Sequence, residues 1–204
     1  MTSRLIVNQI RHTGASADAI TMDASGNVTF PANATCSGTA SGFGGGKLVN
    51  YAQTFKTDTF SADVAQGAFS GDAISISYAA ANSNNKLLIT SHLMIGYESN
   101  QRIGFALFIG GNQETAASGD ASGIITRITM GGANTGNATA IAASQAYLFG
   151  GSGTTSTSAT TYSCRLFQGN NGTDYLYLNR THWNDNYNYG YRGTSSMTIM
   201  EFEP

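Results

Sequence analysis

The chain has 204 residues, of which 41% are apolar, 11% are charged and 25 are glycine, and its formal net charge is −2. This length holds one medium-sized domain with an appendage, and the apolar fraction is sufficient for a folded core. The sequence has no basic stripe and no run near the ~18 apolar residues of a membrane helix, so we expect neither nucleic-acid binding nor membrane insertion.

The charged fraction is less than half of the roughly 25% that is usual in soluble domains. Ser, Thr, Asn and Gly therefore supply much of the polar surface, which is typical of short strands joined by tight turns and of proteins that bury surface in an oligomer. The first 14 residues contain no uninterrupted apolar segment followed by a cleavage site, so we expect no secretory signal peptide.

Residues 1–46 form a predicted N-terminal stalk and attachment region. Apolar residues two positions apart, the period of a strand, occur at Leu5 and Val7, Ile20 and Met22, and Val28 and Phe30. The segment 23–27 joins the last two pieces as a hairpin or as a β-solenoid corner. Because such short strands cannot build a core in one chain, we expect several copies to intertwine around a common axis, with a glycine-rich linker at 37–46.

Residues 47–204 form a predicted all-β domain, a β-sandwich of the jelly-roll type, because short strands alternate with turn clusters. The expected strands span 48–55, 74–78, 86–97, 103–110, 123–130, 141–149, 160–168, 175–179 and 197–202. Segment 138–146 has helical propensity as well, but its flanks resemble strands.

The chemistry-bearing residues do not form a recognisable catalytic or metal-binding motif, so we expect no enzymatic activity, no metal and no cofactor. His92 alternates within an apolar strand and is interpreted as a packing residue. His12 lies in the stalk, where the less favoured alternative is that three symmetry-related copies meet on an axis and hold a metal or anion. Cys36 and Cys164 lie far apart and are expected to be reduced thiols. The carboxylates show no marked pair of the kind that glycoside hydrolysis needs.

The densest polar and aromatic stretch is 181–193. Aromatic rings stack on sugar faces, and Asn and Asp side chains bond to hydroxyl groups, so this mixture suits contact with a carbohydrate or a protein. The predicted receptor-binding residues are His182, Trp183, Asn184, Asp185, Tyr187, Tyr189 and Tyr191. The alternative is that these rings pack a subunit interface and the Asn residues shape turns. The Ser-, Thr- and Gly-rich stretches 110–123 and 131–137 are a second candidate for partner contact, or else solvated loops.

Two groups of segments together resemble short tail-fibre or virion structural proteins of tailed phages, of the type found in marine and freshwater bacteriophages. They are LIVNQI (5–10) with GNVTFPANATCSGTASGF (26–43), and SATTYSCRLFQGNNGTDYLYLNR (158–180) with YRGTSSMTIMEFEP (191–204). The segment 55–60 also takes part, whereas 111–158 matches nothing recognisable. The resemblance implies a homotrimer, a slender N-terminal region that attaches to other virion proteins, and a distal β-sandwich that contacts the host.

The sequence therefore predicts a homotrimeric phage fibre that resides in the virion after assembly in the host cytoplasm and that binds a host surface glycan or protein. Three equal sites on one tip would strengthen weak contacts by multivalency. The alternative is a capsid-attached head fibre or decoration protein with no receptor role, and a depolymerase is a third hypothesis.

Overall fold

The structure is a computed structural model that describes residues 7–11, 13–30, 46–97, 102–133, 139–170, 172–183 and 190–204. The chain divides into two compact units, Met1–Gly44 and Gly45–Pro204, which we call the N-terminal and C-terminal units. Each unit is described by itself.

In the N-terminal unit, three short antiparallel strands lie in the order β1 (Gln9–Ile10), β2 (Ile20–Met22) and β3 (Val28–Thr29). The turn between β2 and β3 is organised by Asp23, whose Oδ1 accepts hydrogen bonds from the backbone N–H groups of Ser25 and Asn27, both at 2.9 Å. The hairpin predicted at this turn is confirmed. The strand expected around Leu5 falls largely outside the described residues, and the intertwining of copies stays a prediction.

The C-terminal unit is built from strands joined by turns and by one short 3-10 helix. The elements are β4 (Leu48–Lys56), β5 (Phe60–Ala65), β6 (Phe69–Tyr78), β7 (Lys86–Tyr97), β8 (Arg102–Ile109), β9 (Asn112–Gln113), η1 (Thr115–Ala117), β10 (Met130–Ala133), β11 (Ala140–Gly150), β12 (Thr160–Gln168), β13 (Thr173–Leu178) and β14 (Ser195–Phe202). Segment 140–150 is therefore a strand, and its helical alternative is excluded.

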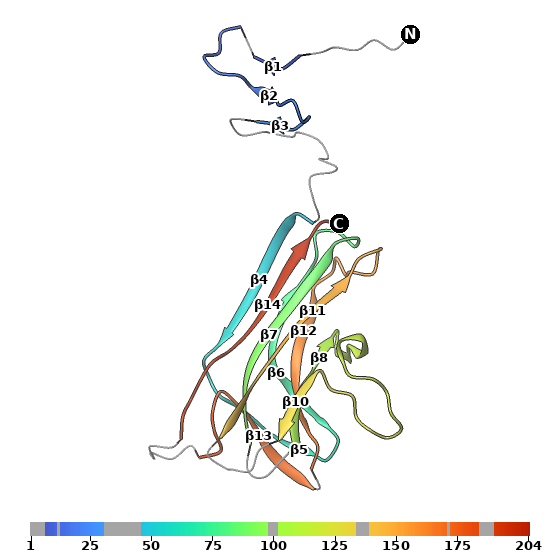
Figure 1. Ribbon diagram of the computed structural model, residues 1–204. Coiled ribbons are helices and arrows are strands. Elements are labelled where there is room, and N and C mark those ends of the chain that lie inside the picture. Colours follow the sequence, from blue (N-terminus) through green and yellow to red (C-terminus); the bar gives the residue numbers. More distant parts are fainter. Residues whose placement is uncertain are drawn as a thin grey trace. The chain divides into compact units, whose positions relative to one another are not determined.

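The strand order is that of a jelly roll (Figure 1). The first sheet runs β4-β14-β7-β11, with β13 also paired to the end of β7 and β5 paired to β13. The second sheet runs β6-β12-β8-β10, with β9 paired to β8. Every pair is antiparallel, and the pairs β4/β14, β5/β13, β6/β12, β7/β11 and β8/β10 are nested like one long hairpin folded over on itself. This nesting is the jelly-roll connectivity, so the predicted fold class is confirmed.

The core lies between the two sheets and follows from the period of two along each strand. In β14, for example, Met197 and Ile199 are fully buried, whereas Thr198 between them is only partly buried. β7 and β12 contribute Leu87, Ile89 and Tyr162 to the same core, all with 0% exposure. The inward rows of the two sheets therefore share one apolar layer.

Two sequence predictions about strands need correction. The strand expected at 123–130 is wrong, because β10 begins only at Met130 and the preceding segment is a loop in which Ile124 is fully exposed. This loop is held by Arg127, which donates hydrogen bonds to the backbone carbonyls of Gly119 and Thr115, both at 2.6 Å. In addition, β5 was not predicted, although Phe60, Ala62 and Val64 alternate with polar residues along it. Its pairing opposite β13 identifies it as a strand.

Candidate binding surface

The loop predicted to bind a receptor lies at one end of the C-terminal unit. It leaves β13 and returns to β14 where Ser195 is opposite Lys56, whereas the chain enters β4 at the other end, where Leu48 is opposite Phe202 (Figure 1). The nine residues of β4 separate these ends by about 30 Å at about 3.3 Å per residue. The loop is thus carried at the far end of the jelly roll from the point where the chain enters it.

Asn179 anchors the beginning of this loop. It is fully buried and adopts a left-handed backbone conformation with φ of 64°, which turns the chain sharply after β13. Its side-chain Nδ2 donates to the carbonyls of Lys56 and Asp58, both at 2.9 Å, and its Oδ1 accepts from Ser195 Oγ at 2.6 Å. One buried side chain therefore ties together the ends of β4, β13 and β14.

The two arms of the loop are also fastened to each other. The backbone N–H of Thr181 donates to the carbonyl of Tyr191 at 3.2 Å, and Thr181 Oγ1 donates to the carbonyl of Trp183 at 3.1 Å. The phenol oxygen of Tyr191 accepts from the backbone N–H of Ala140 at 3.2 Å. Gly96 permits this arrangement, because a Cβ there would overlap the carbonyl oxygen of Arg180.

Four rings and one guanidinium group pack in sequence beside this anchor, which we call the aromatic row: Tyr175, Tyr177, Arg180, His182 and Trp183. The rings of Tyr175 and Tyr177 are parallel within 6° and their centroids are 6.4 Å apart. His182 follows at 5.8 Å from Tyr177, and Trp183 lies edge-on to His182 at 5.6 Å. The guanidinium of Arg180 lies 3.9 Å from the centroid of the Tyr177 ring.

The aromatic row is exposed at both ends and supported in the middle. Tyr175 is 48% exposed and Trp183 is 37% exposed, whereas Tyr177 is 5% exposed. The Tyr177 hydroxyl and His182 Nδ1 share a hydrogen bond at 3.2 Å, which fixes the His182 ring. Rings held in this way lose little conformational freedom on binding, and the exposed parts of the Tyr175 and Trp183 rings are able to contact a planar or sugar-like partner.

The predicted receptor-binding residues are only partly brought together by the described structure. His182 and Trp183 lie in the aromatic row, and Tyr191 lies at the base of the loop and is half-exposed. Asn184, Asp185, Tyr187 and Tyr189 lie outside the described residues.

Sequence reasoning missed Tyr175, Tyr177 and Arg180. The spacing of the two tyrosines indicates that their side chains lie on one face of the strand, because residues two apart on a strand share a face. The proximity of that face to His182 had no sequence signal, since it depends on the turn at Asn179.

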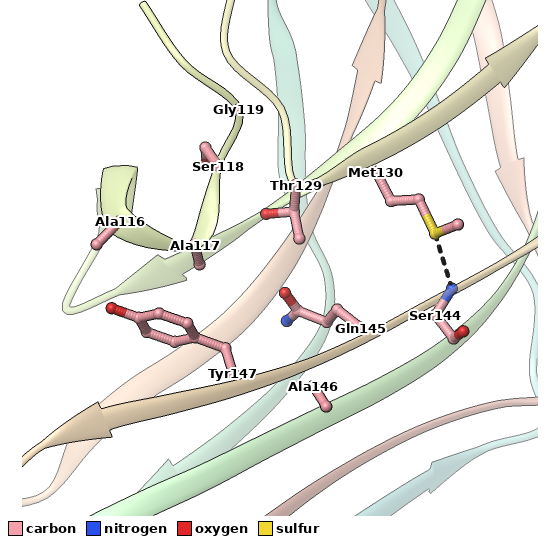
Figure 2. A pocket seen from close by; sticks show the side chains of 10 residues that line it. All are labelled: Ala116, Ala117, Ser118, Gly119, Thr129, Met130, Ser144, Gln145, Ala146 and Tyr147. Atoms are coloured by element: carbon pink, nitrogen blue, oxygen red, sulfur yellow. Dashed lines mark hydrogen bonds between the residues drawn. The ribbon is translucent and has the colours of Figure 1, made fainter.

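A second candidate is a shallow groove between the segment that follows η1 and the edge strand β11. Its volume is about 530 Å³, and its lining comprises Ala116, Ala117, Ser118, Gly119, Thr129, Met130, Ser144, Gln145, Ala146 and Tyr147 (Figure 2). Met130 lies across the groove from β11, and its Sδ accepts the backbone N–H of Ser144 at 3.4 Å. Gln145 Oε1 is buried and has no hydrogen-bond partner among the described residues. The lining carries no charge, so the groove suits a small neutral polar group.

His92 is exposed on the outer face of β7, so its interpretation as a packing residue is wrong. Cys164 is free and fully buried, and burial raises the pKa of its thiol to about 12. His12 and Cys36 lie outside the described residues.

The described part of the chain contains neither a cluster of metal-ligating side chains nor a membrane-spanning helix. No group of three or more His, Cys, Asp or Glu residues there is placed to hold a metal ion. No helix in the same part is long and apolar enough to cross a membrane.

Comparison with known proteins assigns no family to this chain. No protein family and no curated protein matches the chain, so the resemblance to phage fibres stays a prediction from the motifs. Among solved structures, the chain is similar to a chain in the structure of infectious bursal disease virus Gx strain, with 12% sequence identity and a TM-score of 0.41. The match covers 85% of this chain and 45% of that chain, so this chain spans about half the length of the solved one.

Proposed function

We propose that the chain is a homotrimeric fibre protein of a phage virion, whose C-terminal jelly roll binds a receptor on the host surface and performs no catalysis. The observation that carries this proposal is the position of the aromatic row, at the end of the jelly roll that lies farthest from where the chain enters β4. A fibre needs this polarity, with attachment at one end and recognition at the other.

The chemistry of the row fits a neutral host glycan or a protein surface. Tyr175 and Trp183 offer exposed ring faces, and the Arg180 guanidinium adds hydrogen-bond donors beside them. Each site would bind weakly, and three sites on one tip, repeated on several fibres, would turn weak contacts into lasting attachment. Residues 1–46 would dock onto other virion proteins, and the protein would assemble in the host cytoplasm, where the thiol of Cys164 stays reduced.

The test measures binding of fluorescently labelled full-length protein to a panel of intact bacterial cells. We expect saturable binding that unlabelled protein competes away and that Tyr175→Ala and Trp183→Ala each abolish. Ile125→Ala is the matched control, because Ile125 is an apolar side chain 69% exposed on a different loop.

Two outcomes would contradict the proposal. Binding that survives both aromatic variants would remove the aromatic row as the receptor site. Absence of binding to any cell, together with tight binding to purified virion proteins, would favour the head fibre or decoration protein without a receptor role.

A further inference from the structure

The two outer faces of the jelly roll differ in character, which indicates that they face different surroundings. On the second sheet, Asp72 Oδ1 pairs with Arg165 Nε at 2.7 Å and also accepts from Ser163 Oγ at 2.8 Å. The exposed residues Ser75 and Ser77 continue this polar face along β6. Phe69, Phe108 and Phe167 also lie on this face, but their rings pack against one another, and the Arg165 guanidinium lies 4.3 Å from the centroid of the Phe108 ring, which is only 7% exposed. The rings on this sheet are therefore largely covered, and its exposed surface is polar.

The outer face of the first sheet is apolar instead. The register places four large apolar side chains in one row across all four strands, directly opposite one another: Leu148 (β11), Leu88 (β7), Met200 (β14) and Tyr51 (β4). Phe202 and Leu48 are opposite each other at one end of the sheet, and Phe55 lies at the other end, opposite Ser196. We call this surface the apolar face.

The exposed area of the apolar face is comparable with the largest apolar patch on a typical monomer, about 300–600 Å², and such patches are often contact sites. Tyr51, Phe55, Leu148 and Leu48 are 66%, 63%, 54% and 50% exposed, respectively. At about 200 Å² for a fully exposed large side chain, these four residues alone leave on the order of 450 Å² of mostly apolar surface in water. A standard stable interface buries about 800 Å² on each partner, and the half-buried side chains between these four supply further contact area.

The charges on the apolar face favour a second copy of the same chain as its partner. The outward residues of β4, β14, β7 and β11 include no Asp or Glu, and the basic residues among them are Lys86 at one end and His92. Between the rows, Gln53 Nε2 donates to Thr198 Oγ1 at 3.1 Å, so these polar groups are already paired within the sheet. A nearly uncharged face offers no complementarity to a charged partner, and it can meet its own copy without a cluster of like charges.

The edge of the apolar face, which is formed by β11, is also uncharged and incompletely covered. β11 is an 11-residue edge strand that contains no charged residue. Natural proteins protect such edges with charges, bulges or covering segments, because an exposed uncharged edge invites association. The covering here is partial: Met130 and Tyr191 each accept one outward N–H, from Ser144 and Ala140 respectively.

We infer that the apolar face is the surface through which copies of this chain associate. This inference rests on the proposed function only for the number of copies, which is three. The location of the interface follows from the exposed apolar side chains themselves. Each protomer would bury the Leu148–Leu88–Met200–Tyr51 row against a neighbouring copy, leaving the polar second sheet facing outward. The tyrosines of the aromatic row lie on the same outer face as this row but at the other end of β7, where Tyr177 is opposite Gly96, so the contact between copies would end short of them.

The experiment measures protection of single cysteines in purified full-length protein with Cys36→Ser as the background, because Cys164 is buried and unreactive. Gln53→Cys and Ser144→Cys place a thiol on the apolar face, and Ser75→Cys and Ser77→Cys place one on the second sheet as matched controls. A water-soluble maleimide should label the first two about tenfold or more slowly than the controls when the protein is oligomeric by native mass spectrometry. The double variant Tyr51→Glu/Leu148→Glu should remove that protection while retaining the wild-type circular dichroism spectrum.

Equal labelling at the four positions in an oligomeric sample would overturn the inference, because the interface would then lie elsewhere, for instance in residues 1–46. A protein that is monomeric at all accessible concentrations would overturn it as well. Neither result depends on binding to cells, so a failure of receptor binding is distinguishable from a failure of this interface.

Discussion

The buried carboxylate of Glu201 provides the sharpest test of how the jelly roll is held together. Glu201 lies on β14 with 0% exposure and faces the turn between β6 and β7. Its Oε2 accepts from the Tyr78 hydroxyl at 2.5 Å, and its Oε1 accepts from Asn85 Nδ2 at 2.6 Å and from the backbone N–H of Ala81 at 2.8 Å. The carboxylate therefore fixes a turn that lies more than 100 residues away in the sequence.

The substitution Glu201→Met keeps a side chain of similar length and removes all acceptor atoms. Three donors would then be left without their partner, and each costs about 1–3 kcal/mol when buried, so we expect a loss of at least about 3 kcal/mol in the free energy of unfolding. For a unit of about this size the melting temperature shifts by about 2–4 °C per kcal/mol, so thermal unfolding should occur at least about 6 °C lower. Glu203→Met removes the same charge at an exposed position two residues later and serves as the control.

The effect should depend on pH in a defined direction. Burial raises the pKa of Glu201, but the hydrogen bonds from Tyr78, Asn85 and the backbone of Ala81 outweigh it and hold the pKa below its ordinary value of 4.5. A lowered pKa in the folded state means that the stabilisation is complete above about pH 4.5 and is lost as the pH falls through the folded-state pKa. The difference in melting temperature between wild type and Glu201→Met should therefore narrow only below pH 4.5.

The assay is thermal unfolding followed by circular dichroism from pH 3 to pH 8, with chemical denaturation at pH 7 to obtain the free energy. A Glu201→Met protein as stable as wild type at pH 7 would refute the reasoning, because the three donors would then have to be satisfied without the carboxylate. A difference that stays constant down to pH 3 would refute the pKa argument alone.

Three further predictions concern the anchor, the buried thiol and the aromatic row. Asn179→Gly should lower the free energy of unfolding by about 3 kcal/mol, because three hydrogen bonds of the side chain are lost. Asn179→Ala should lower it by about 1–2 kcal/mol more, because a backbone φ of 64° is unfavourable for alanine. Equal free energies of unfolding for the two variants in urea titrations would contradict this. In a Cys36→Ser background, Cys164 should react with iodoacetamide at pH 8 only on unfolding, since burial raises its pKa to about 12; rapid labelling of folded protein would contradict its position in the core. Trp183→Ala should abolish cell binding and lower the free energy of unfolding by no more than about 1 kcal/mol. The reason is that the substitution removes a partly exposed ring but keeps the hydrogen bond from Thr181 to the backbone carbonyl of residue 183. A large fall in melting temperature would show instead that the ring is needed for packing.

The period of two was a reliable guide wherever a strand is covered on one face by the core. The strand predicted at 86–97 has those bounds in the structure, and 160–168 does as well. In contrast, the segment 123–130 has β-branched residues but no covering sheet, so Ile124 and Ile125 are exposed in a loop. A local pattern shows that a segment can form a strand, but neighbouring strands must supply the hydrogen bonds and the burial.

Of the candidate site, the sequence revealed the residue types and not their arrangement. The concentration of Trp, Tyr and His in 181–193 was visible without a structure, and so was the shared face of Tyr175 and Tyr177. Their union in one row depends on the left-handed turn at Asn179, which brings His182 back to within 5.8 Å of Tyr177. That turn is stabilised by acceptors on Lys56 and Asp58, which are more than 100 residues away along the chain.

By itself, the sequence determined the fold class, because low charge, abundant turn-forming residues and repeated alternation leave an all-β domain as the architecture that buries these side chains. Only the tertiary structure decided which strands are neighbours, and therefore which surface is apolar. Leu148, Leu88, Met200 and Tyr51 come from four distant segments, and they form one row because β7 pairs with both β11 and β14, and β14 pairs with β4. The physical reason is that alternation sets the two faces of each strand locally, whereas register and sheet order come from long-range pairing, which no local pattern encodes.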